Sequence, residues 1–452
     1  MGRALVLSSA AFSAIGGFLF GYDSGIISST IAQPLFIEYF EKPSDADTGG
    51  IVSSFQAVLG SALQGGAVTI AMLIAGRLFA GIAVGQLSSI VPMYCAEISP
   101  PNIRGMLSGL LQWMLSWGFL AAQWIGYGST HANSSFQWRF PLSFQAVPAM
   151  ILAIGILFLP ESPRWLMEKD RAEETRETLR RLHYDGTNDD FILAEFQEIQ
   201  NSIQADGRSQ TRSWSEIIKR PSWRRRLLLG CGIQAFGQLS GINVINYYGP
   251  RIYESLGITT SQSLMITGIN GTTGIVENTL ILLIIDRIGR IWPVTIGAFG
   301  MAGCMLTNAI LNKYFPPTAS NPNADALRAQ VAMNFVFQLF FQPLGCISWI
   351  YPAEIFPTEI RALGASLSAL SNWCLNLVFA QCSPIALGDL GFNYFYFFFA
   401  FNLISAVCYI LFYPETKRRT LEEMDLVFAT AEEYTSASGG KKLEVAGTTH
   451  VD

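Results

Sequence analysis

The sequence predicts an all-α protein that crosses a membrane many times, and three observations support this fold class. Half of the 452 residues are hydrophobic and only 14 % are charged, whereas soluble domains carry about 25 % charged residues. Apolar stretches long enough to cross about 30 Å of hydrocarbon recur along most of the chain. Charged motifs also occur twice at a nearly constant spacing, which indicates two duplicated halves.

The apolar stretches are each about 20 residues long, the length that a membrane-spanning helix needs. We predict eleven such spans, at residues 5–28, 50–71, 73–95, 105–127, 139–159, 227–249, 263–285, 291–312, 330–352, 363–385 and 393–413. Several of them contain Gly or Pro, which membrane helices tolerate when neighbouring helices satisfy the freed backbone groups.

One long polar segment, residues 160–226, separates the spans into a bundle over 1–159 and a bundle over 227–415. This linker holds 13 of the 29 Lys and Arg residues and is expected to form short helices. Because Lys and Arg gather in cytoplasmic loops, we expect the linker and the tail, 416–452, to face the cytoplasm. The end of the tail is polar and is expected to be disordered.

Residue types that enzymes and metal sites require are sparse in this chain. The seven Cys form no C-x-x-C pair, and only three His occur. No nucleophile and base set, metal cluster or phosphate-binding loop is recognisable. We therefore expect no enzyme activity, no cofactor, no metal site and no nucleic-acid partner.

The duplication is carried by two pairs of short motifs. AEISPPNIRG begins at Ala96, and AEIFPTEIRA begins at Ala353, 257 residues later. PESPRW begins at Pro160 and is echoed by PETKRR at Pro414, 254 residues later. Nearly equal offsets indicate parallel repeats, an arrangement found in transporters built from two similar halves.

Charged residues of these motifs, and of DRIGR at 286–290, lie at predicted helix ends. There they can link neighbouring helices by charge-assisted hydrogen bonds and hold one conformation closed. The alternative is that they only anchor the helix ends at the membrane surface. Four motifs in register favour the latch, which we expect at the cytoplasmic side from Glu97, Arg104, Glu161, Arg164, Asp286, Arg287, Arg290, Glu354, Arg361 and Glu415.

Together with GQLSGINVINYY at 237–248, these motifs resemble the sugar-porter family of the major facilitator superfamily, fungal hexose carriers in particular. The resemblance runs from about Gly17 to Arg419. It implies a major facilitator fold of two pseudo-symmetric helical bundles that carries a monosaccharide by alternating access. The implied partners are a small sugar, protons and the lipid bilayer, and the implied location is the plasma membrane.

The resemblance also implies a central sugar site made of polar side chains on apolar helices. Paired donors and acceptors in a dry cavity suit a ligand rich in hydroxyl groups. The matching positions are Gln112, Gln238, Asn243, Asn246, Trp349, Asn372 and Asn376. One departure is Gly237, which stands where many hexose carriers have the first Gln of a Q-Q motif, so the substrate is open at this position.

Asp23 and Arg77 are isolated charges inside apolar stretches. A charged side chain within a membrane is costly and by default indicates function. In proton-coupled sugar porters the corresponding Asp and Arg form the coupling pair, because protonation of the Asp weakens its attraction to the Arg. We therefore predict proton symport, with passive sugar transport or a purely structural ion pair as the alternatives.

The two halves differ in length before the first motif. They begin near Arg3 and Arg226, 223 residues apart, so the first half is shorter by about 34 residues, or one span with its loop. No D-R-x-G-R sequence occurs before Glu97. Residues 51–66 read like the beginning of one span joined, near Gln56 and Ala57, to the end of the next. About eleven spans would then replace twelve.

This fused segment conflicts with the expected topology. It can span once, lie shallow in the membrane, or force the first span to invert, and each alternative can misplace Asp23 relative to Arg77. A skipped exon, an error in the gene model or a variant that no longer transports would each explain the shortened half. A transport-inactive sensor or truncated paralogue of the same fold is therefore an alternative function.

Overall fold

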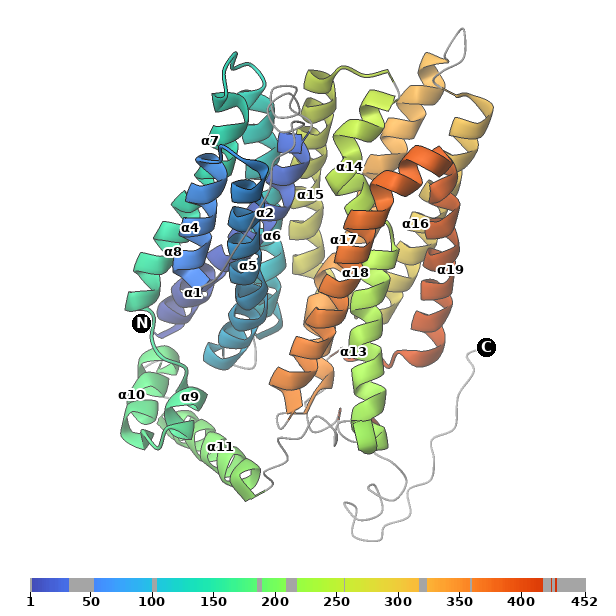
Figure 1. Ribbon diagram of the computed structural model, residues 1–452. Helices are drawn as coiled ribbons and strands as arrows, with labels where there is room; N and C mark the ends of the chain where they lie inside the picture. The colour runs from blue at the N-terminus through green and yellow to red at the C-terminus, as the bar shows by residue number, and fades with distance from the viewer. Residues whose placement is uncertain are drawn as a thin grey trace.

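The computed structural model describes residues 2–31, 53–99, 104–184, 189–208, 218–255, 257–316, 323–357, 360–417, 424, 427 and 428. The regular structure of these residues is entirely helical, and most of the long helices run side by side (Figure 1). Eight described stretches are long and apolar enough to cross a membrane, and the longest, Leu363–Phe412, contains two helices. The number of crossings stays a prediction.

The helices before the linker form one group on the left of Figure 1. They are α1 (Gly2–Ser13), α2 (Ile15–Ile31), α4 (Ser53–Gly65), α5 (Ile70–Ile98), α6 (Arg104–Ser129), α7 (Phe136–Phe144) and α8 (Ala146–Gly155), which a 3₁₀ turn, η2 (Ile156–Phe158), extends. The predicted first span is thus divided between α1 and α2, and the span predicted at 139–159 is divided between α7 and α8.

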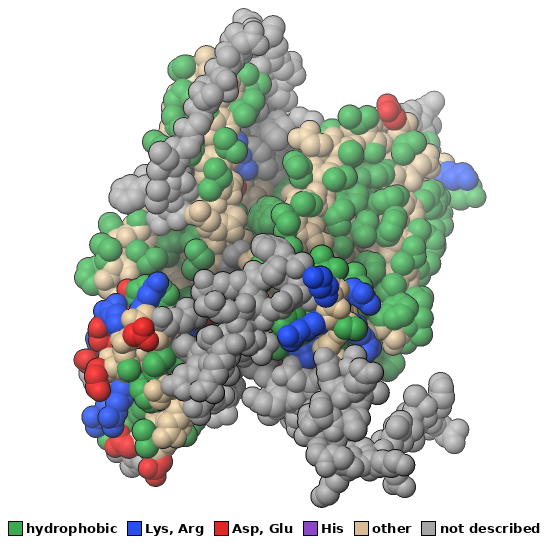
Figure 2. All heavy atoms as spheres, turned by 60° about the horizontal axis from the view of Figure 1, so that its bottom comes forward, with side chains coloured by type: hydrophobic (Ala, Val, Ile, Leu, Met, Phe, Trp, Pro, Cys, Tyr) green, Lys and Arg blue, Asp and Glu red, His purple; other side chains and the backbone are tan. Residues whose placement is uncertain are grey.

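The linker forms three short helices at one end of the molecule (Figure 1). They are α9 (Pro163–Glu168), α10 (Ala172–His183) and α11 (Asp189–Arg208). The start of the chain lies at this same end, because α1 packs against α10. Figure 2 shows Lys, Arg, Asp and Glu side chains gathered over the linker helices, while hydrophobic side chains cover much of the flank beside them.

The helices after the linker form the second group, on the right of Figure 1. They are α13 (Pro221–Leu239), α14 (Ile242–Ser255), α15 (Thr260–Ile288), α16 (Ile291–Tyr314), α17 (Ala324–Ile355), α18 (Arg361–Leu390), the 3₁₀ turn η4 (Gly391–Tyr394) and α19 (Phe395–Phe412). The largest buried apolar cluster draws only on this group, from Trp223 to Phe428. Each group therefore packs around its own core.

The fused segment forms α4, a helix of 13 described residues. Its described residues extend over about 20 Å at 1.5 Å per residue, less than about 30 Å of hydrocarbon. The helix ends at Gly65 and α5 begins at Ile70, so residues 66–69 interrupt the stretch predicted at 50–71, of which residues 50–52 lie outside the described residues. Thr69 caps α5 by accepting a hydrogen bond from the Met72 backbone N–H. The three alternatives for the fused segment stay predictions.

The duplication is repeated in the geometry of two matched tyrosines. The Tyr94 hydroxyl donates to the Pro160 carbonyl at 2.8 Å, and the Tyr351 hydroxyl donates to the Pro414 carbonyl at 3.1 Å. Each tyrosine lies near the end of a long helix, and each proline begins one of the paired motifs. The same contact therefore joins equivalent parts of both halves.

Close packing of α2 on α6 depends on glycines at which the two backbones meet. A Cβ at Gly118 would lie 2.1 Å from the Phe18 carbonyl oxygen, and a Cβ at Gly21 would lie 1.9 Å from the Leu115 carbonyl oxygen. Small residues let membrane helices approach this closely. The contact holds α2, with Asp23, against the helix that carries Gln112.

We predict that Gly118→Ala lowers the melting temperature of the detergent-solubilised protein by several degrees, because overpacking costs about 1–3 kcal/mol. The matched control is Gly128→Ala on the same helix, where a Cβ meets nothing within 4 Å. That change should leave Tm unchanged or raise it slightly, since Ala favours helix. Equal melting temperatures for the two variants would contradict the close approach.

Candidate functional site

A cavity lies between the two groups of helices. Its walls come from α2 and α6 on one side and from α13, α14, α15, α17 and α18 on the other. All of the positions expected to contact a sugar line it, namely Gln112, Gln238, Asn243, Asn246, Trp349, Asn372 and Asn376. The structure thus brings together residues that are up to 264 positions apart in the chain.

A break in the predicted span at 227–249 positions the first amides of the site. Helix α13 ends at Leu239 and α14 begins at Ile242. Gly241 lies between them with a φ of +93°, in the left-handed region that favours glycine. Broken helices of this kind form binding sites in membrane transporters, because they expose polar groups to a cavity.

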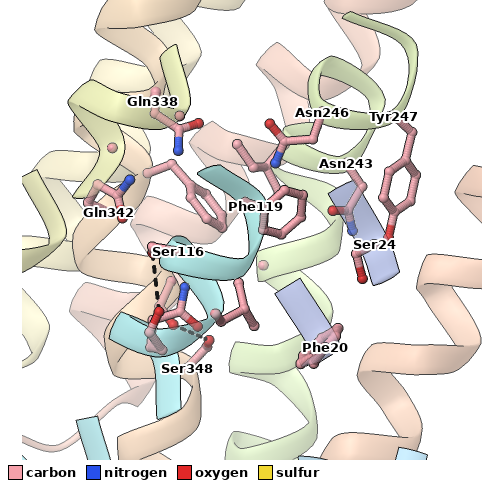
Figure 3. Close-up of a pocket in the computed structure, with 18 of the residues that line it drawn as sticks. Phe20, Ser24, Ser116, Phe119, Asn243, Asn246, Tyr247, Gln338, Gln342 and Ser348 are labelled. Carbon is pink, nitrogen blue, oxygen red and sulfur yellow. Dashed lines mark hydrogen bonds between the residues drawn. The ribbon is translucent and has the colours of Figure 1, made fainter. Parts of the chain in front are cut away.

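Gln238 is the centre of an amide network in the cavity wall. Its side-chain N–H donates to Asn372 Oδ1 at 2.6 Å. Its Oε1 accepts hydrogen bonds from Asn243 and, at 3.5 Å, from Asn376. Asn376 also donates to the Tyr247 hydroxyl at 3.0 Å. The network joins three helices and leaves amide groups facing the cavity, as Figure 3 shows for Asn243.

The opposite wall is tied to the C-terminal helices by other polar contacts. The buried Asn278 side chain donates to the Gln112 carbonyl at 3.2 Å and to Ser116 Oγ at 2.6 Å. At one side of the cavity Phe20 packs against two indoles, with ring centroids 6.3 Å from Trp349 and 5.1 Å from Trp373. This aromatic contact joins α2 to α17 and α18.

Sequence motifs missed several residues that line the cavity. Phe20, Ser24, Ser116, Asn270, Gln338 and Gln342 all contribute to its wall, and most are labelled in Figure 3. Their only sequence signal is a polar or aromatic residue on an apolar helix. Gly237 also lines the cavity, and a Cβ there would meet nothing within 4 Å. Open space therefore stands where the resemblance implies a Gln.

Asp23 and Arg77 form an ion pair next to the cavity. Arg77 Nη1 lies 2.6 Å from Asp23 Oδ1, and their side chains are 29 % and 11 % exposed. The misplacement considered for the shortened half therefore does not occur. Gln64, from the fused segment, accepts a hydrogen bond from Arg77 at 3.4 Å and donates to the Gly76 carbonyl at 3.3 Å.

Polar contacts lead from the ion pair to the amide network. Ser24 follows Asp23 in the chain, and Figure 3 shows its side chain close to that of Tyr247. The same hydroxyl accepts a hydrogen bond from Asn376, which contacts Gln238. Both groups of helices share this chain of contacts.

Three of the predicted latch residues meet at the linker end of the C-terminal helices. Arg290 binds Glu354 through two nitrogens, at 2.7 and 3.3 Å. The backbone N–H groups of Arg290 and Ile291, at the start of α16, donate to the Glu415 carboxylate at 2.9–3.0 Å. A helix N-terminus stabilises an anion in this position. Thr416 donates to Glu354 as well.

The other predicted latch residues take different places. Glu97 accepts a hydrogen bond from Ser162 at 2.5 Å, and Arg287 contributes its backbone carbonyl, which accepts from Lys417. Glu161 and Arg164 form no ion pair with other described residues. The side chains of Arg104, Asp286 and Arg361 lie outside the described residues.

Comparisons with known proteins agree with this geometry. Residues 48–428 match the family model "Sugar (and other) transporter". The chain is 39 % identical to MFS-type transporter criB of Aspergillus cristatus, with 95 % of this chain and 94 % of that protein covered. It is 32 % identical to MFS glucose transporter mfs1 of Aspergillus flavus (92 % and 88 % covered) and 31 % identical to quinate permease of Neurospora africana (94 % and 89 % covered).

The fold is similar to that of a solved transporter. The proton:xylose symporter XylE, bound to 6-bromo-6-deoxy-D-glucose, superposes with a TM-score of 0.75 over 95 % of this chain and 100 % of its own, at 23 % identity. The protein is therefore an all-helical, multi-pass integral membrane protein and not an enzyme. It belongs to the sugar transporter family of the major facilitator superfamily.

Proposed function

We propose that this protein is a secondary transporter that carries a monosaccharide together with a proton by alternating access. The observation that supports it most is one cavity, lined by seven matched side chains, beside an ion pair of a buried Asp and a half-buried Arg. Two similar proteins are a glucose transporter and a proton:xylose symporter, and both names indicate a monosaccharide as the substrate.

The cavity suits a ligand with many hydroxyl groups. An amide side chain offers donors and acceptors together, so each can pair with a sugar hydroxyl in either sense. The aromatic faces of Trp349 and Phe20 give apolar surface on which the ring can pack. Because both helix groups contribute walls, their relative rocking would open the cavity to one side of the membrane at a time.

Proton coupling follows from the ion pair. Protonation of Asp23 removes its charge and weakens its attraction to Arg77, which lies on a different helix. The contacts through Ser24, Tyr247 and Asn376 bring the state of this pair to the sugar-binding amides. A ligand and a proton that both favour one arrangement would then shift the same equilibrium.

The cluster of Arg290, Glu354 and Glu415 is proposed as a latch on the linker side. Its bidentate ion pair and backbone hydrogen bonds hold the ends of α15, α16 and α17 together with the chain after α19. Because Lys and Arg are enriched in the linker, this end is proposed to face the cytoplasm. The N-terminus would lie on the same side because α1 packs on α10, and the plasma membrane is the proposed location.

The shortened first half favours a second candidate, a transport-inactive sensor or paralogue. No D-R-x-G-R sequence stands before Glu97, so the first half lacks the counterpart of a motif that contributes Arg290 to the latch. The two candidates differ in labelled-sugar uptake by transport-deficient cells. Absence of uptake for every common hexose, despite normal surface expression, would favour the inactive form.

We predict that Asp23→Asn abolishes accumulation of sugar against a gradient but retains equilibrating uptake, because the side chain no longer binds a proton. Uptake should be measured with and without an uncoupler, which should affect only the unaltered protein. Asp325→Asn is the matched control, since Asp325 forms an exposed pair with Arg328. Unchanged accumulation in Asp23→Asn would exclude this Asp as the coupling group and leave passive transport.

We predict that Gln238→Ala raises the sugar concentration for half-maximal uptake at least about tenfold, since each lost hydrogen bond costs about 1 kcal/mol and 1.4 kcal/mol is tenfold. Adding Asn372→Ala to Gln238→Ala should raise this concentration by a smaller factor than Asn372→Ala does in the unaltered protein, because the two amides act together. The control is Gln262→Ala at the exposed start of α15. Fully additive effects would contradict a shared network.

A further inference from the structure

A half-buried glutamate, Glu277, lies close in sequence to residues that line the cavity and takes no part in the ion pair or latch. It is on α15, seven residues after Asn270 and three after Gly274. Residues at this spacing share one face of a helix, and both Asn270 and Gly274 line the cavity. Glu277 therefore belongs to the face of α15 that forms this wall.

The carboxyl group of Glu277 is only partly satisfied. Its Oε2 is buried and has no hydrogen-bond partner. No Lys, Arg or His of the described chain forms an ion pair with it. A buried acceptor without a partner is costly, so it favours any ligand group that can donate to it.

Other side chains of the cavity wall also have buried acceptors without a partner. Gln338 Oε1, Asn270 Oδ1 and Gln123 Oε1 are also buried without a partner, and all three residues line the cavity. The missing side chain at Gly274 makes room for two amides of α17, because a Cβ there would lie 3.3 Å from the nitrogens of Gln338 and Gln342. Figure 3 shows these two amides on the same wall. An amide can turn over and exchange donor for acceptor, whereas a carboxylate offers only acceptors.

The charge of the cavity wall distinguishes two classes of substrate, whereas overall sequence identity does not. The chain is almost equally identical to a glucose transporter, at 32 %, and to a quinate permease, at 31 %, and quinate carries a carboxylate. The described lining of the cavity contains no Lys, Arg or His. A ligand carboxylate would meet the Glu277 carboxylate in a site of low dielectric, where like charges repel strongly.

We infer that Glu277 sets the substrate class, so that the cavity accepts neutral or ammonium-bearing sugars and excludes sugar acids and other organic acids. This inference rests on the proposed monosaccharide function. Glu277 acts through the field of its charge, and it is a specificity-determining residue. The probes are D-glucose, D-glucuronate and D-glucosamine, which share a pyranose ring and differ in charge.

Binding to the purified, detergent-solubilised protein at neutral pH tests this inference independently of transport. The fluorescence of the indoles beside the cavity, Trp349 among them, reports occupancy. The unaltered protein should bind glucuronate at least tenfold more weakly than glucose. Glu277→Gln keeps the size of the side chain and removes its charge, and it should strengthen glucuronate binding at least fivefold and weaken glucosamine binding at least threefold, with glucose changed less than threefold.

Opposite changes in the affinities for glucuronate and glucosamine distinguish an effect of charge from a change in packing. A change in packing would alter the affinities for all three sugars in the same direction. The control is Glu174→Gln, which removes one negative charge from the exposed side of α10 in the linker, away from the cavity. It should leave all three affinities unchanged. Equal binding of glucose and glucuronate, or parallel shifts in Glu277→Gln, would overturn this inference alone. Failure to bind glucose at all would overturn the monosaccharide proposal and this inference with it.

Discussion

The ion pair between Asp23 and Arg77 is the interaction around which the N-terminal helices are arranged. A charge within hydrocarbon is costly unless it is paired and hydrogen-bonded. Here the pair joins α2 to α5 at 2.6 Å, and Gln64 of α4 adds a hydrogen bond to the guanidinium. Separating any of these helices would leave a polar group without its partner, so their mutual positions are constrained even where a span is shortened.

That constraint gives α4, a helix of 13 described residues, a role in positioning the Arg77 helix. Its Gly60 meets Gly76 of α5 at backbone contact, and Arg139 of α7 donates to the Gly65 carbonyl at its end. The described residues of the fused segment therefore keep the surface that packs on the Arg77 helix. The motifs at the linker end show the opposite outcome, because the DRIGR motif that supplies Arg290 in the second half has no sequence counterpart before Glu97.

Much of the fold and of the site could be predicted from sequence, for identifiable reasons. Gln238, Asn243 and Asn372 stand in recognisable motifs, and the intramembrane charges are conspicuous in apolar stretches. Gln338, Gln342 and Glu277 could not be assigned in advance, because the face that α17 or α15 turns to the cavity depends on how it packs on α6. The break within the stretch predicted at 50–71 could not be placed in advance because hydropathy counts residues, whereas Gly65 and the cap at Thr69 end one helix and begin another.

The open space at Gly237 bears on how this protein can change over generations. Several positions facing the cavity are held by hydrogen bonds or ring contacts, so altering one of them disturbs its neighbours. At Gly237 a new side chain would enter empty space without displacing the protein around it. Small residues such as Ala or Ser are within a single nucleotide change of a glycine codon. Substrate range can therefore change at this position in small steps, without affecting the packing of the helices or the ion pair.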